Sequence, residues 1–106
     1  MIDEERLTKA MTYLAQTDEQ AAELKADVDR SEYKAKVMKA TVFLHFEGTV
    51  SDREAQALKD TAVMEAYMAH FQAIRDYQAV ANKRALEVLV CEVWRSINAN
   101  RRVGNI

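Results

Sequence analysis

Apolar residues recur every three or four positions along most of the chain, which is the spacing of an amphipathic helix. The first such series consists of Leu7, Ala10, Met11 and Leu14. It follows an acidic start at Asp3, and negative charge suits the positive end of the helix dipole. The pattern predicts a first, short helix over residues 3–15.

Thr17 has the sequence context of a helix N-cap. Its hydroxyl is placed to accept a hydrogen bond from the backbone amide of Gln20, and the Gln20 side chain can reach back in the same way. The apolar series that follows has serine and histidine as its only polar members: Ala21, Leu24, Val28, Ser31, Ala35, Met38, Val42 and His45. Gly48 adopts the left-handed conformation at low cost and ends the pattern. A long second helix is therefore predicted over residues 17–47.

A second capping pattern follows the glycine. Ser51 and Glu54 form a capping box, with Val50 before the cap where a hydrophobic staple residue belongs, so a short helix is predicted over residues 52–59. Next, either Asp60 or Thr61 caps a last helix, or the chain continues straight on as a helix. Because the chain has no proline, nothing interrupts this helix until Gly104.

The last helix changes character along its length. A narrow apolar stripe broadens toward the C-terminus, where apolar residues point nearly all round the helix: Leu86, Val88, Leu89, Val90, Val93, Trp94 and Ile97. Such a helix needs cover on more than one side, and we expect the helices over residues 3–15 and 17–47 to supply it. The residues near the turn are more than two helices can bury, which favours self-association: Phe43, Leu44, Phe46, Tyr67 and Phe71.

These patterns predict an all-α fold in a single helical domain of residues 1–106. The two long helices form a long antiparallel helical hairpin, with the short N-terminal helix packed on its broad apolar end and a small helix at the turn. We expect a homodimer or higher oligomer.

Composition narrows the function without identifying it. The 106 residues include 15 basic and 17 acidic ones, so the net charge of −2 selects neither nucleic acid nor an anionic membrane as partner. A single cysteine, Cys91, cannot form an internal disulfide, which fits a reducing cytoplasm. No apolar run approaches the roughly 20 residues of a membrane span. We therefore expect a soluble intracellular protein.

The residues that carry common chemistries are missing or isolated. The only glycines are Gly48 and Gly104, so no glycine-rich phosphate loop can exist. His45 and His70 suggest a metal site, but they lack the spacing of paired ligands and read more simply as polar members of a packed helix face. Cys91 lies in the most apolar stretch, where a thiol is usually buried and inert. We expect no enzyme, no cofactor and no metal.

Charge is distributed in blocks of alternating sign. Residues 33–46 contain three lysines and no acidic residue, and the C-terminal part is basic overall. One interpretation is a local phosphate-binding or partner-binding surface, with these candidate residues: Lys34, Lys36, Lys39, Arg95, Arg101 and Arg102. The other interpretation is compensation within the chain, because a hairpin places the basic end of the last helix near the acidic N-terminal part.

Two motifs also carry a resemblance. The turn Gly48-Thr49-Val50-Ser51-Asp52-Arg53-Glu54-Ala55 and the tail from Trp94 to Ile106 are similar to those of small, mostly uncharacterised helical proteins of temperate bacteriophages. Such proteins tend to be encoded among early genes for recombination and replication. The resemblance covers most of the chain and brings no catalytic or binding residues with it.

The resemblance implies two functions in the host cytoplasm. The first is a non-enzymatic accessory protein that binds nucleic-acid-processing machinery, with or without direct DNA contact. The second is an inhibitor that binds a host defence complex. Our own hypothesis for such an inhibitor is that its acidic residues, for example Asp27, Asp29 and Glu32, mimic a nucleic acid.

Overall fold

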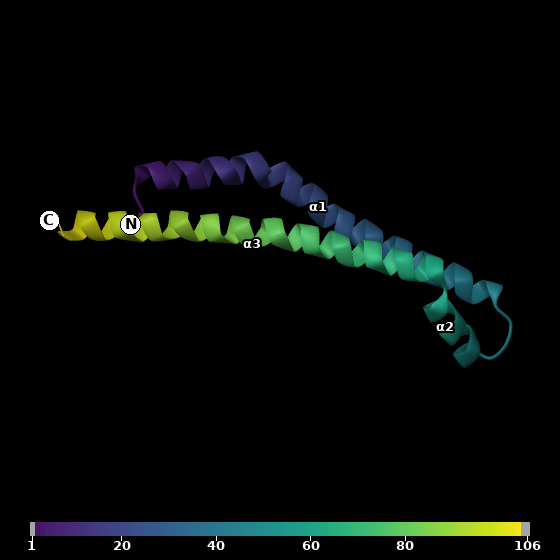
Figure 1. The fold of residues 1–106 in the computed structure, drawn as a ribbon. Coiled ribbons are helices and arrows are strands. Elements are labelled where there is room, and N and C mark those ends of the chain that lie inside the picture. Colours follow the sequence, from purple (N-terminus) through teal and green to yellow (C-terminus); the bar gives the residue numbers. More distant parts are fainter. Residues whose placement is uncertain (1, 105–106) are drawn as a thin grey trace. The chain divides into compact units, whose positions relative to one another are not determined.

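The computed structural model describes residues 2–104, which form three helices and no strand. Helix α1 spans Glu4–His45, α2 spans Val50–Lys59 and α3 spans Thr61–Gly104 (Figure 1). The prediction of an all-α fold is therefore confirmed. The last two residues of the C-terminal motif lie outside the described residues.

Helix α1 is continuous through Thr17, so the predicted separate N-terminal helix and the cap at Thr17 are wrong. The Thr17 hydroxyl donates to the carbonyl oxygen of Tyr13 at 2.8 Å, one turn earlier in the same helix. It also accepts a hydrogen bond of 2.6 Å from Arg84 of α3. A threonine whose hydroxyl bonds to its own preceding turn is accommodated inside a helix and does not start one.

The turn after α1 is built around Gly48 and Thr49. Gly48 has a φ of +120°, in the region that favours glycine, which confirms its predicted role. The N-cap of α2 is Thr49, whose side chain accepts a hydrogen bond of 3.2 Å from the Asp52 amide. The predicted cap at Ser51 is wrong, because Ser51 lies inside the first turn of α2.

Asp60 separates α2 from α3. Its backbone N–H donates to the carbonyl oxygen of Ala57 at the end of α2. Its carboxylate accepts hydrogen bonds from the amides of Ala62 at 2.9 Å and Val63 at 3.2 Å. Of the two caps that the sequence allowed, Asp60 is the one used, because it serves both helix ends.

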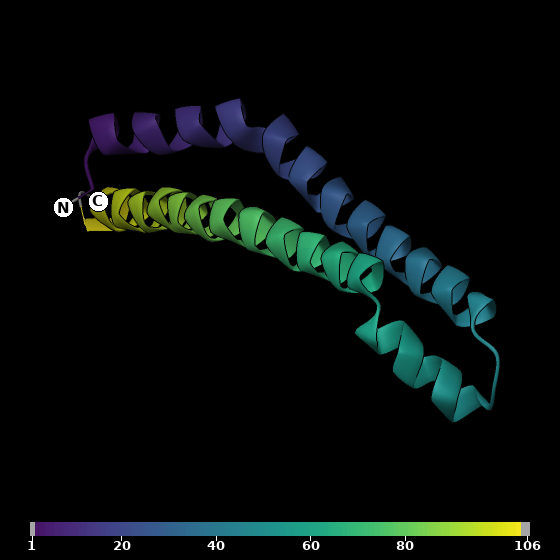
Figure 2. The ribbon, with the colours of Figure 1, turned by 45° about the vertical axis from the view of Figure 1, so that its right-hand side comes forward.

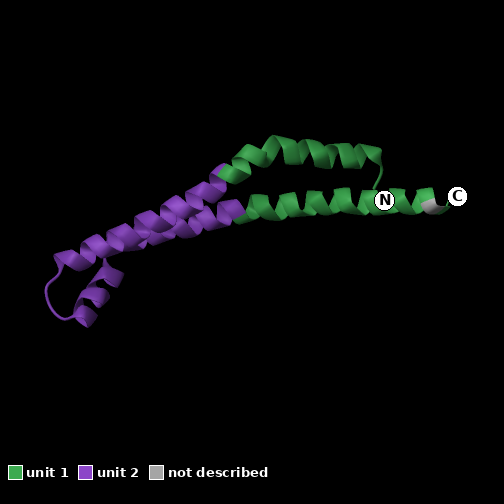
Figure 3. Ribbon diagram, turned by 180° about the vertical axis from the view of Figure 1, so that it is seen from behind, with its two compact units in different colours: residues 1–22, 78–106 green, residues 23–77 purple. Residues whose placement is uncertain are grey.

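The helices form two compact units (Figure 3). Unit 1 contains the chain up to Ala22 and from Gln78 onward, and unit 2 contains Glu23–Tyr77.

Unit 2 has a small core to which all three helices contribute. Val42 of α1, Ala57 of α2 and Val63 of α3 are buried, with Phe43 and Tyr67 packed against them. Figure 2 shows the α1 and α3 segments of this unit side by side. Arg53 attaches α2 to α1, because its Nε donates to the Phe43 carbonyl oxygen at 3.1 Å and its guanidinium lies 4.3 Å from the centre of the Phe43 ring.

In unit 1, α1 and α3 are held together by polar contacts and by the buried side chains of Ala10 and Val90. Arg84 donates to the carbonyl oxygen of Leu14 at 2.8 Å. The predicted core position of Leu89 and Val93 is wrong for the single chain, since their side chains are 52% and 37% exposed. One helix segment beside α3 covers only one face of it, so the broad apolar part of α3 keeps an exposed face.

Candidate interaction surfaces

Many large apolar side chains are exposed in both units, and exposed apolar patches mark interaction sites. In unit 2 these include Tyr33, Val37, Met38, Leu44, Met64, Met68, Phe71 and Ile74. In unit 1 they include Met11, Leu86, Val88, Leu89 and Val93. The buried apolar residues are, by contrast, alanines and valines: Ala10, Ala35, Val42, Ala57, Val63 and Val90.

Unit 2 contains an apolar groove of about 420 Å³ between α1 and α3, which we call the unit 2 groove. It is lined by Ser31, Tyr33, Lys34, Val37, Met38, Thr41, Ala66 and Ala69. Nearly all of its accessible lining is carbon. A groove of this kind suits a helix or an apolar side chain of a partner better than a charged ligand.

A second cavity of unit 2, of about 370 Å³, is more polar. Its lining includes Lys36, Lys39, Phe43, Glu54 and Tyr67.

Lys36 already forms an ion pair within α1. Its Nζ lies 2.8 Å from the carboxylate of Glu32, one turn earlier. This hydrogen bond and ion pair lower the pKa of Glu32 and raise that of Lys36. Lys36 therefore binds an external anion only in competition with Glu32.

Unit 1 carries an apolar strip on α3, formed by Leu86, Leu89 and Val93, which we call the α3 strip. The spacing of three and four residues places these side chains on one face of the helix. They are 55%, 52% and 37% exposed, respectively. The strip has the pattern of a helix–helix packing seam and no cover within the unit.

The six predicted basic residues do not form one cluster. Lys34, Lys36 and Lys39 belong to unit 2, where Lys34 lines the unit 2 groove and the other two line the second cavity. Arg95, Arg101 and Arg102 belong to unit 1 and are exposed.

Arg101 lies among acidic residues of the same unit. It lines a cavity of about 280 Å³ together with Asp3, Glu4 and Trp94. None of the ion pairs in the described part of the chain links Arg101 to Asp3 or Glu4, so the compensating interpretation stays a prediction.

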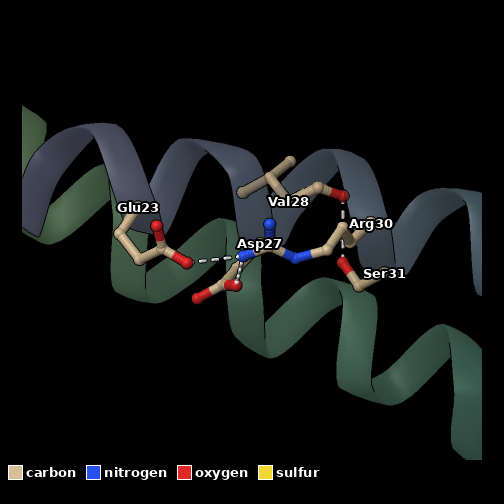
Figure 4. A network of polar contacts seen from close by, with 5 residues as sticks. All are labelled: Glu23, Asp27, Val28, Arg30 and Ser31. Carbon is tan, nitrogen blue, oxygen red and sulfur yellow. Dashed lines mark hydrogen bonds and ion pairs between the residues drawn. The ribbon is translucent and has the colours of Figure 1, made fainter.

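Two of the three acidic residues named for nucleic-acid mimicry are paired within α1. Asp27 accepts a hydrogen bond from Arg30, which also reaches Glu23 at 2.8 Å (Figure 4). Glu32 is paired with Lys36, as described above, whereas Asp29 is exposed. Internal pairing offsets much of the negative charge that a mimic would present.

The histidines lie in different environments. His70 is buried, and its Nδ1 lies 3.0 Å from the hydroxyl of Ser31. Because that hydroxyl donates to the Val28 carbonyl oxygen at 2.9 Å, it accepts from His70. His45 is exposed. Within residues 2–104, no group of three or more histidine, cysteine or carboxylate residues is arranged to hold a metal ion.

Sequence reasoning missed the ion pair between Arg6 and Glu87. Both guanidinium NH groups of Arg6 donate to the Glu87 carboxylate, at 2.7 and 2.9 Å. The hydrogen bond from Arg6 lowers the pKa of Glu87, which is buried. A glutamate in the middle of an apolar stretch, between Leu86 and Val88, was the available signal, because such a residue needs a partner.

Comparison with known proteins found no matching protein family, no curated protein of similar sequence and no solved structure of similar fold. None of the helices in the described part of the chain has an apolar stretch long enough to cross a bilayer.

Proposed function

We propose that this chain is a non-enzymatic accessory protein that binds a protein of nucleic-acid-processing machinery. The observation that carries the proposal is the α3 strip, in which Leu86, Leu89 and Val93 expose a helix-packing seam without cover inside unit 1. An apolar seam of this spacing is a binding surface for another helix. The resemblance to phage proteins of the recombination and replication region suggests the class of partner and the host cytoplasm as the location.

The proposed arrangement is an antiparallel helical hairpin that displays these surfaces. Contacts within each unit support it. In unit 1, Arg6 of α1 pairs with Glu87 of α3. Leu14 lies eight residues further along α1, and its carbonyl oxygen accepts a hydrogen bond from Arg84, which lies three residues before Glu87 in α3. These two contacts support opposite directions for the two helices within this unit.

In unit 2, Ser31 of α1 contacts His70 of α3. Val42 lies later in α1 and shares a core with Val63, which lies earlier in α3 than His70.

The basic residues have a secondary role in the proposal. Arg95 is exposed on α3 but lies two residues beyond Val93, and therefore on a different face of the helix from the α3 strip. Arg101 and Arg102 extend this basic character, and Lys34, Lys36 and Lys39 do so in unit 2. Exposed basic charge outside the contact itself speeds association with an acidic partner.

The alternative, a host-defence inhibitor that mimics nucleic acid, has less support. Its acidic residues Asp27 and Glu32 are occupied by Arg30 and Lys36. An inhibitor that binds through apolar contacts is a variant of the same protein-binding proposal and differs only in its partner.

Affinity purification from phage-infected cells tests the proposal, with nuclease added to remove bridging nucleic acid. The wild-type chain is expected to retain a recombination or replication protein. Leu89→Lys is expected to lose it, because a charge in the centre of the α3 strip opposes apolar packing. Leu58→Lys is the matched control, since it makes the same chemical change at a leucine that is 63% exposed on α2 of unit 2, outside the α3 strip.

Three results would contradict the proposal. They are retention that depends on intact nucleic acid, a partner from outside nucleic-acid metabolism, and equal loss with Leu89→Lys and Leu58→Lys. Direct DNA binding is measured separately with purified chain, where contacts through basic residues weaken steeply as salt rises.

A further inference from the structure

The unit 2 groove combines a ridge and a hollow. α1 supplies the ridge, in which Tyr33, Val37 and Met38 are 71%, 45% and 37% exposed. α3 supplies the hollow, where the lining residues are Ala66 and Ala69, each with a single methyl group as side chain. Small residues allow another helix to approach closely, and large residues need a hollow to fill.

We propose that a second copy of this chain docks in the unit 2 groove, so that the ridge of each copy fills the hollow of the other. A symmetric dimer contact uses the same patch on both partners, and such a patch must contain both halves of the fit. The unit 2 groove has this property. The proposal does not rest on the proposed function, whose α3 strip belongs to unit 1.

The charges at the groove support the same occupant. Lys34 lines the groove from α1 and is exposed. Glu65 is exposed on α3 and precedes Ala69 by four residues, so it borders the hollow on the same helix surface. Among the described residues, neither forms an ion pair. When the ridge of one copy lies over the hollow of the other, Lys34 of each faces the helix that carries Glu65.

The exposed area is also sufficient for a dimer. The chain exposes 8039 Å², whereas a compact monomer of 12.1 kDa exposes about 6,000 Å². A standard interface takes about 800 Å² from each partner. The surplus of about 2,000 Å² covers one such interface and leaves surface for a further partner.

Sedimentation velocity of the purified full chain tests the proposal. Wild type is expected to dimerise. Ala69→Arg fills the hollow with a charged side chain and is expected to weaken the dimer by at least about tenfold. Since Ala69 is exposed in the single chain and arginine favours helices, this variant keeps its helical circular dichroism. Ala15→Arg is the matched control, an exposed alanine of α1 in unit 1, and is expected to dimerise like wild type.

A charge swap tests the register of the two copies. Lys34→Glu and Glu65→Lys are each expected to weaken the dimer by about threefold, because each places like charges together. The double variant is expected to recover wild-type affinity. A monomeric wild type, an Ala69→Arg variant that dimerises like wild type, or a double variant weaker than both single ones would overturn the proposal.

Discussion

Matched substitutions of Val63 and Val93 test which part of the chain contains the main apolar core. Val63 is 2% exposed in the core of unit 2, and Val93 is 37% exposed in the α3 strip. Each is replaced by alanine, so the chemical change and the gain in helix propensity are the same for both. The difference between the two variants therefore reports burial alone.

The expected difference follows from the packing. Replacing valine by alanine removes two carbon atoms, which cost about 1.6 kcal/mol of transfer free energy when fully buried. A cavity adds to this at Val63, and the better helix propensity of alanine offsets about 0.5 kcal/mol. We expect Val63→Ala to lower the free energy of unfolding by about 2 kcal/mol and Val93→Ala by no more than about 0.5 kcal/mol.

Urea denaturation followed by circular dichroism at equal protein concentrations measures both values. Equal losses of unfolding free energy in the two variants would show that Val63 is no more deeply buried than Val93. A larger loss at Val93 would place the main core in the C-terminal part of α3, as the apolar pattern of the sequence had predicted.

Three further predictions concern the α2 cap, the ion pair of Glu87 and the exposure of Val93. Thr49→Ala is expected to cost about 1 kcal/mol in urea denaturation through loss of the α2 cap, and Ser51→Ala close to nothing, so equal costs would contradict the assigned cap. The lowered pKa of Glu87 contributes stability that is complete above the carboxyl's ordinary pKa, about 4.3, and lost as the pH falls through the lowered value. Glu87→Gln should therefore flatten the fall of the melting temperature below about pH 4.3, and an unchanged slope would exclude the ion pair with Arg6. Val93→Asp is expected to keep the helical circular dichroism spectrum of the chain, because the new charge stays in water, and loss of helicity would show that Val93 is covered within the fold.

The helix boundaries that local chemistry determines could be predicted from the sequence. Gly48 has the positive φ that its identity favours, and Asp60 caps α3 with its own carboxylate. Thr17 could not be interpreted correctly, because its hydroxyl is held by Tyr13 and by Arg84, and Arg84 is 67 residues away. A capping pattern does not reveal such a distant contact.

The surfaces were harder to predict than the helices. Apolar spacing identified Leu89 and Val93 as residues that need cover, but it does not say whether the cover comes from the same chain. The charge pattern identified Lys34 as a candidate binding residue, but it did not indicate that this residue lines an apolar groove. Glu87 and Arg6 are 81 residues apart, and only the packing of their helices brings them together.

The central claim is that apolar surface left exposed by one chain is covered by a second copy at the unit 2 groove. The rate of methionine oxidation by dilute peroxide tests it directly, because exposed thioethers react and covered ones do not. Met38 lines the groove, whereas Met68 is 64% exposed and does not line it. Raising the protein concentration is expected to slow the oxidation of Met38 several-fold relative to that of Met68. A ratio of the two rates that stays the same from dilute to concentrated protein would contradict it.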